Sequence, residues 1–170
     1  MDNLDLLPGG PPESLTAQRA DIVVFACGDP AHAEHESIAI AACTSLPADV
    51  LERVDIKLVG PMRPEYLQAL KPGSHVVIAD TVPGATGEIV EVRFIDLVGR
   101  EEPLEASSAT VQPLAEVIAM AELLRSEPIA GRFLGMGVAM VDLSAPPDPM
   151  AVEQMREAVL NLIAELTAQD

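Results

Sequence analysis

The hydrophobic positions of this chain fall into short β-branched runs that alternate with helical patterns. Runs at Asp21–Gly28, Val54–Val59 and Ser74–Val82 predict strands, because each is bounded by glycine, proline or polar residues. The run at Ser74–Val82 is apolar almost throughout, which is typical of a strand covered on both faces. A further strand, interrupted by glycines, is predicted over 131–141.

Helical periodicity occupies the intervening stretches. Residues 37–45 predict a buried helix, and residues 63–70 predict a short helix with proline near its start. A closing amphipathic helix is expected over Met150–Thr167. The longest internal helix is predicted within 110–127, where the residues expected to face the core are Leu114, Val117, Ile118, Ala121 and Leu124.

The segment 83–97 differs from the other strands, because apolar and charged residues alternate there after a Pro-Gly turn. This pattern favours a more exposed, antiparallel strand. The alternation of strands and helices predicts an α/β fold, a three-layer α/β/α sandwich around a mostly parallel sheet. Residues 1–20 are rich in proline, glycine and acid and predict a loose leader, with a single domain over 21–170.

Charge and composition narrow the classes of partner. The net charge of −17 argues against nucleic acid or an anionic membrane and favours a basic protein or a cation. We see no signal peptide and no membrane-spanning run, so a cytoplasmic protein is expected. Cys27 and Cys43 are expected to be small buried hydrophobes. Phosphate-binding glycine motifs and a nucleophile elbow are also absent from the sequence.

Two polar clusters follow predicted strands, where α/β sheets bind ligands. The loop Gly28–Ser37 reads "GDPAHAEHES" and contains His32, His35 and Glu36, and Asp80 ends the run "VVIAD". Nitrogen and carboxylate ligands together suit zinc or nickel better than magnesium or calcium. The alternatives remain open: Glu36 stabilises a helix start, Asp80 caps a turn, and the histidines are solvated loop residues.

The order of these motifs resembles the maturation proteases of [NiFe] hydrogenases. The stretch "CGDPAHAEHESIAIAACTSL" is similar to the family's first strand, loop and helix, with Asp29 in the place of an asparagine. The resemblance makes Glu36 the counterpart of the first metal ligand. It makes Asp80, in "VIADTV", the counterpart of the second. The tail "FLGMGVAMVDLSAPPDPMAVEQMREAVLNLIAEL" is similar to the family's last strand and helix.

The third ligand of the family, a histidine that opens the long helix, is not matched. In "ASSATVQPLAEVIAMAELL" its position falls on Thr110 or, less well, Ala109. The hydroxyl of threonine is a poor nickel or zinc ligand. Either His35 or His32 supplies the missing nitrogen, or the chain binds a partner without cleaving it.

The resemblance implies an endopeptidase that removes the C-terminal extension of a [NiFe]-hydrogenase large subunit, with Glu36 and Asp80 as catalytic contacts. Nickel would be carried by the substrate and bound weakly by the protease itself. The first alternative is a catalytically degenerate relative that holds a hydrogenase precursor as an assembly scaffold. The second is an α/β domain that binds a small ligand in the same crevice. The oligomeric state stays open.

Overall fold

The computed structural model describes residues 13–14, 21–28, 38–83, 87–98, 113–138 and 147–169. Strands and helices alternate along it, as the hydrophobic pattern predicts. Their order is β1 (Glu13–Ser14), β2 (Ile22–Cys27), α1 (Ile38–Thr44), α2 (Ala48–Leu51), β3 (Asp55–Val59), α3 (Pro64–Gln68), β4 (His75–Pro83), β5 (Ile89–Arg93), α4 (Phe94–Val98), α5 (Leu114–Arg125), β6 (Gly131–Val138) and α6 (Pro149–Ala168). Within these residues, no helix is both long and apolar enough to cross a bilayer.

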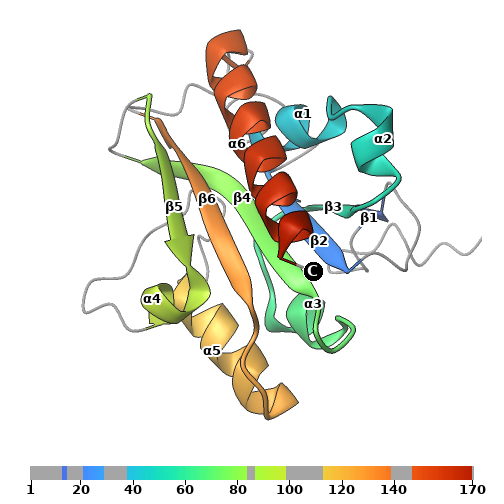
Figure 1. Ribbon diagram of the computed structural model, residues 1–170. Helices are drawn as coiled ribbons and strands as arrows, with labels where there is room; N and C mark the ends of the chain where they lie inside the picture. The colour runs from blue at the N-terminus through green and yellow to red at the C-terminus, as the bar shows by residue number, and fades with distance from the viewer. Residues whose placement is uncertain are drawn as a thin grey trace, which may run out of the picture.

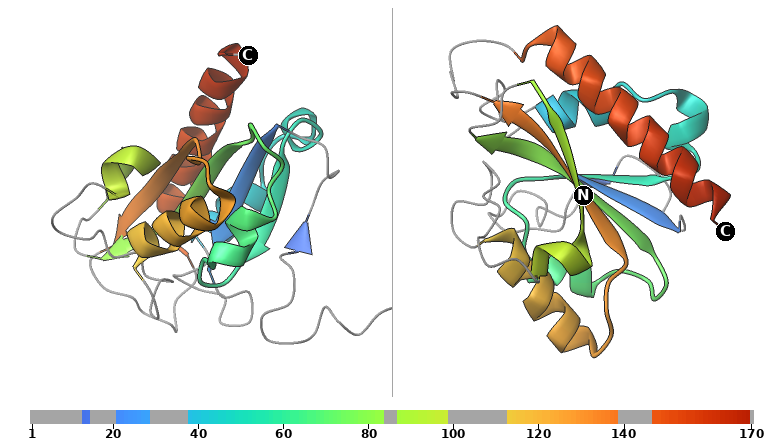
Figure 2. Two further views of the ribbon diagram at one scale, coloured as in Figure 1. Left: turned by 90° about the horizontal axis from the view of Figure 1, so that it is seen from below. Right: turned by 60° about the vertical axis from the view of Figure 1, so that its left-hand side comes forward.

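The strands form one six-stranded sheet in the order β1-β3-β2-β4-β6-β5. The four inner strands are parallel, while β1 and β5 pair antiparallel at the two edges. Figure 1 shows α6 crossing one face of the sheet, and the right-hand view of Figure 2 shows α4 and α5 on the opposite face. The predicted three-layer sandwich with a mostly parallel sheet is confirmed.

Two apolar cores separate the sheet from its helices. One lies beneath α1, α2 and α6, and includes the inward side chains Val24 and Val77. The other lies beneath α3, α4 and α5, and includes Phe25 and Ile78. All residues of β2 are buried, because helices cover both of its faces and leave no solvated side for polar residues.

Two short elements differ from the sequence-based expectation. The predicted leader contributes Glu13–Ser14 to the sheet as β1, which pairs with the otherwise open edge of β3. The apolar residues after Arg93 form the one-turn helix α4 instead of prolonging β5. Phe94 and Leu97 lie three residues apart and are both buried, which is the spacing of a helix face.

The prediction that Leu124 faces the core is wrong. Four of the five residues predicted for this stripe are buried, but Leu124 is 62% exposed. At about 100° per residue, Leu124 lies roughly 70° away from the centre of the stripe formed by the other four. The outer side of α5 is therefore more apolar than expected.

Candidate functional site

Asp80 is the one predicted site residue that the described part of the chain contains. It lies near the carboxyl end of β4, opposite Gly135 of β6, and is only 2% exposed. Its neighbours Ile78 and Val82 belong to the core beneath α3, α4 and α5. Because side chains alternate along a strand, the carboxylate of Asp80 points into that same layer.

The strand order makes this edge of the sheet a natural place for a ligand. From β2 the chain turns to β3 on one side, whereas β4 lies on the other side of β2. The direction in which successive strands are added therefore reverses between β2 and β4, which makes this a topological switch point. Ligands of open α/β sheets bind outside the carboxyl ends of the strands at such a point. Asp80 lies at this point, one residue beyond the last β4 residue that pairs with β2. Gly28 directly follows β2 there, and its N–H donates to Val59 O at 3.0 Å.

The residues beside Asp80 are small and buried. Cys27 lies one position beyond the last β2–β4 pair, Ala26 with Ala79, and faces the same layer as Asp80. On the other side, Gly135 provides no side chain, and Val82 and Phe133 fill the space that its Cβ would need. The carboxylate is therefore enclosed by protein on both sides.

Thr81 is a polar residue of this region that the sequence reasoning did not single out. Its backbone N–H donates to Asp80 Oδ1 at 2.7 Å. Its own side chain is 1% exposed, on the opposite face of the sheet, and within the described chain its hydroxyl has no hydrogen-bond partner. A hydroxyl group within an apolar strand was the only sequence signal. Among the described residues, Thr81 therefore adds a buried hydroxyl without a hydrogen-bond partner directly next to Asp80.

Comparison with solved structures identifies the fold. The chain superimposes on the hydrogenase maturating endopeptidase HybD of E. coli with a TM-score of 0.63 and 18% identity, over 85% of this chain and 92% of that one. It superimposes on the [NiFe] hydrogenase maturation protease HycI of Thermococcus kodakarensis with a TM-score of 0.62 and 19% identity, over 86% and 92%. No protein-family model matches the sequence, and no curated protein matches it significantly.

The chain has the fold of the hydrogenase maturation proteases. The likeness extends over most of both chains, so the α/β/α domain is nearly the whole of each neighbour as well. At this level of identity it establishes the architecture only.

Most of the ligand set predicted for this maturation-protease fold lies outside the described residues. This applies to Asp29, His32, His35 and Glu36, in the connection from Gly28 to the start of α1. It applies equally to Ala109 and Thr110, in the connection that ends at Pro113 before α5. The expected approach of Glu36 to Asp80 therefore stays a prediction.

The described side chains of this protein do not form a metal site by themselves. No group of three His, Cys, Asp or Glu side chains that could hold a metal ion is found among them. His75 begins β4, five residues before Asp80. It therefore lies about 16 Å away, at the amino end of the same strand. The additional ligands needed for a metal site at Asp80 would have to come from outside the described residues.

Neither Cys27 nor Cys43 is placed to act as a catalytic nucleophile. Cys43 lies in α1 and is fully buried, and burial raises the pKa of its thiol to about 12. A thiol with so high a pKa is not a nucleophile at neutral pH. Cys27 is fully buried as well, in agreement with the expectation that both cysteines are small hydrophobes.

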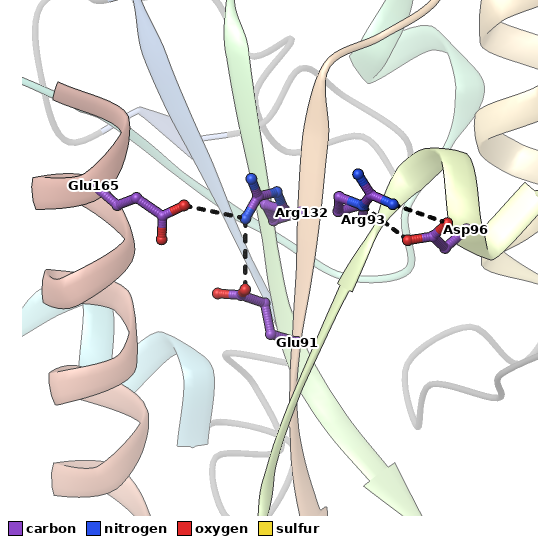
Figure 3. A network of polar contacts seen from close by, with 5 residues as sticks. All are labelled: Glu91, Arg93, Asp96, Arg132 and Glu165. Atoms are coloured by element: carbon purple, nitrogen blue, oxygen red, sulfur yellow. Dashed lines mark hydrogen bonds and ion pairs between the residues drawn. The ribbon is translucent and has the colours of Figure 1, made fainter. Parts of the chain in front are cut away.

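A second group of charges lies near the amino end of β6, far from Asp80. Arg93 and Arg132 are direct cross-strand partners on β5 and β6, an arrangement of like charges that is unfavourable alone. Figure 3 shows how acids compensate: Arg93 Nε donates to Asp96 at 2.9 Å, and Arg132 contacts Glu91 and Glu165 at 3.5 and 3.6 Å. Both arginines line a cavity of about 240 Å³, but three acids neutralise them, so we assign the network to stability.

Proposed function

We propose that this chain is an endopeptidase that removes the C-terminal extension of a [NiFe]-hydrogenase large subunit after nickel insertion. The observation that carries the proposal is the buried carboxylate of Asp80, near the carboxyl end of β4 at the topological switch point between β2 and β4. The likeness to endopeptidases over 85% of the chain supports the same reading.

The chemistry follows from what a buried carboxylate does. A buried carboxylate is stabilised by hydrogen bonds, by an opposite charge or by a cation, so Asp80 is suited to contact a cation or a positively polarised group. We propose that Asp80 and Glu36 contact the nickel that the substrate carries, and that His35 adds a nitrogen ligand. Held in this way, the nickel would orient the scissile peptide and polarise it for attack by water.

A direct test compares cleavage of a nickel-loaded large-subunit precursor by the wild type, Asp80→Asn and Glu36→Gln. Metal contacts of this kind supply several kcal/mol to the transition state, so each variant should cleave at least about 100-fold more slowly. Asp55→Asn is the matched control, because Asp55 is also a buried aspartate but lies at the start of β3 beside Lys57. Equal cleavage by Asp80→Asn and the wild type would refute the proposal.

Thr110 favours the alternative, a scaffold that holds a hydrogenase precursor without cleaving it. A hydroxyl in place of an imidazole lowers the affinity of the site for nickel. Titration with Ni²⁺ and the cleavage assay should be repeated with Thr110→His and with His35→Ala. A wild type that binds the precursor but cleaves nothing, with activity gained by Thr110→His, would establish the scaffold. Cleavage by the wild type that His35→Ala abolishes would establish the endopeptidase.

A further inference from the structure

The exposed large apolar side chains are concentrated on two neighbouring helices. Among the described residues there are six of them, of which five lie on α4 and α5 and only Met150 lies elsewhere. The five are Ile95, Val98, Met120, Leu123 and Leu124. The two helices pack against each other and lie on the same side of the sheet (Figures 1 and 2).

The outer face of α5 has the spacing of a binding surface. Met120, Leu123 and Leu124 follow the i, i+3, i+4 pattern of one helix face, and they are 45%, 78% and 62% exposed. The inner face is already occupied, since Leu114 and Ile118 are buried against the sheet. A helix that is apolar on both sides is typical of one that is buried on both sides. Within the described part of the chain, nothing covers this outer stripe.

The charges around the stripe indicate the chemistry of its partner. Glu116 is exposed and lies one turn before Met120 on the same face, whereas Glu122 lies roughly 150° around the helix from the centre of the stripe. Neither carboxylate forms an ion pair within the part of the chain that the structure describes. Arg125, the one cation of α5, is turned inward and bonded to carbonyls at the end of α3. The exposed face of α5 is therefore apolar and acidic.

A second copy of this chain does not suit such a surface. Two chains of net charge −17 repel each other, and a two-fold contact through α5 would bring the unpaired acids of both copies together. A surface with apolar side chains bordered by lysine or arginine is complementary in both respects.

We propose that the outer face of α5 docks the substrate protein, which would present an apolar surface bordered by basic side chains. This inference rests on the proposed function and names a contact separate from the cleavage site. The stripe ends at Leu124, next to the turn that leads into the amino end of β6, whereas Asp80 lies near the carboxyl end of β4. The surface would therefore recognise the folded body of the large subunit while its extension reaches the opposite edge.

The test measures the Kd between the full-length chain and a large-subunit precursor of the source organism that carries its C-terminal extension. The variants are Leu123→Ser with Leu124→Ser, and separately Glu116→Lys. Loss of an anchor in a docking surface should weaken binding about tenfold or more. Glu116→Lys should also reduce the dependence of the Kd on NaCl concentration, because an attractive charge pair is removed.

Matched controls lie on α6, across the sheet. Met150→Ser removes the sixth exposed apolar side chain, and Glu157→Lys reverses an exposed carboxylate. Both should leave the Kd within about twofold of the wild-type value. Glu116→Lys alters only a solvated side chain, so it keeps the test decisive if the double leucine variant folds poorly.

Three outcomes would overturn the inference in different ways. If the precursor binds and is cleaved equally by all variants, the α5 surface is not used and the proposed function stands. If the leucine substitutions only convert a wild-type dimer into a monomer and leave the Kd unchanged, the surface binds a second copy. If the wild type neither binds nor cleaves the precursor, the proposed function fails and the docking inference fails with it.

Discussion

Asp80 and Thr81 are neighbours on β4 whose side chains enter opposite halves of the core. The carboxylate accepts a backbone hydrogen bond, whereas the hydroxyl has no partner within the described residues. Both are more than nine-tenths buried. Within the described residues, a buried hydroxyl without a hydrogen-bond partner thus lies near the carboxyl end of β4, beside the candidate site.

Thr81→Val tests whether the unsatisfied hydroxyl is retained for function. Valine has the same shape without the buried polar group, so the free energy of unfolding should rise by about 1 kcal/mol. Chemical denaturation of both proteins measures the difference. If Thr81 serves the site, cleavage of the precursor by the variant should fall although stability rises, a known trade-off at functional positions. A less stable variant would mean that the hydroxyl has a bonding partner.

Gly135, opposite Asp80, should not tolerate even one methyl group. An added Cβ would lie 2.9 Å from a ring carbon of Phe133 and also against Val82, both in the core. We expect Gly135→Ala to lower the free energy of unfolding by about 1–3 kcal/mol through overpacking. Gly60→Ala is the control, because its nearest neighbour would be a carbonyl oxygen at 3.9 Å. Equal effects in thermal unfolding would contradict this packing argument.

At the scale of elements, Arg125 joins α5 to α3. Its guanidinium Nη1 donates to the carbonyls of Leu67, Gln68 and Leu70 at 3.0, 3.3 and 2.8 Å. These carbonyls lie at the end of α3, where a helix has no partners of its own for them. One cation thus satisfies the end of one helix from the last turn of another.

Removing this cation should be costly. Hydrogen bonds from a charged group contribute about 1.5–3 kcal/mol, so Arg125→Ala should lower the free energy of unfolding by at least about 2 kcal/mol. Arg53→Ala is the comparison, because Arg53 is exposed and among the described residues it pairs with Asp49, four residues earlier, where about 0.5 kcal/mol is expected. Urea unfolding of the two variants gives the ranking, and similar losses would show that the α3 carbonyls are adequately solvated without Arg125.

The elements also show what the sequence could predict. Long apolar runs such as Ser74–Val82 identified the buried strands within a residue or two, because a parallel sheet leaves them no polar face. The five-residue helix α4 was missed, since one turn is too short for its periodicity to differ from that of a strand. The exposure of Leu124 was missed because hydrophobicity alone does not distinguish a buried residue from an exposed one.

The candidate site was predictable only where it lies on a strand. Asp80 ends an apolar run, and the termination of that run fixes its place at the carboxyl edge. Glu36, His35 and Thr110 belong to connections, where spacing along the chain does not determine position in space. Their approach to Asp80 therefore stays a prediction.

For the whole molecule, the dominant property is the charge of −17 on 170 residues. Self-repulsion of this size opposes the compact state and is screened by salt. We expect the Tm to rise by several degrees between 10 and 500 mM NaCl, as measured by differential scanning calorimetry. KCl at the same ionic strength should have the same effect, because screening does not distinguish the two cations. A Tm that falls with salt would mean that the ion pairs outweigh the repulsion.

The pairing of the central strands has a consequence for how the chain reaches its native state. His75 lies opposite Ile22, and Gly131 lies opposite Val76, so each pairing joins parts of the chain more than fifty residues apart. Such non-local contacts require large loops to close before any stabilisation is gained, which slows folding relative to a helical bundle of the same length. Asp80 lies on the strand that takes part in both pairings. A nascent chain that ends before β6 lacks one neighbour of the strand that carries Asp80, so we expect the site to assemble only after Val138 has been synthesised.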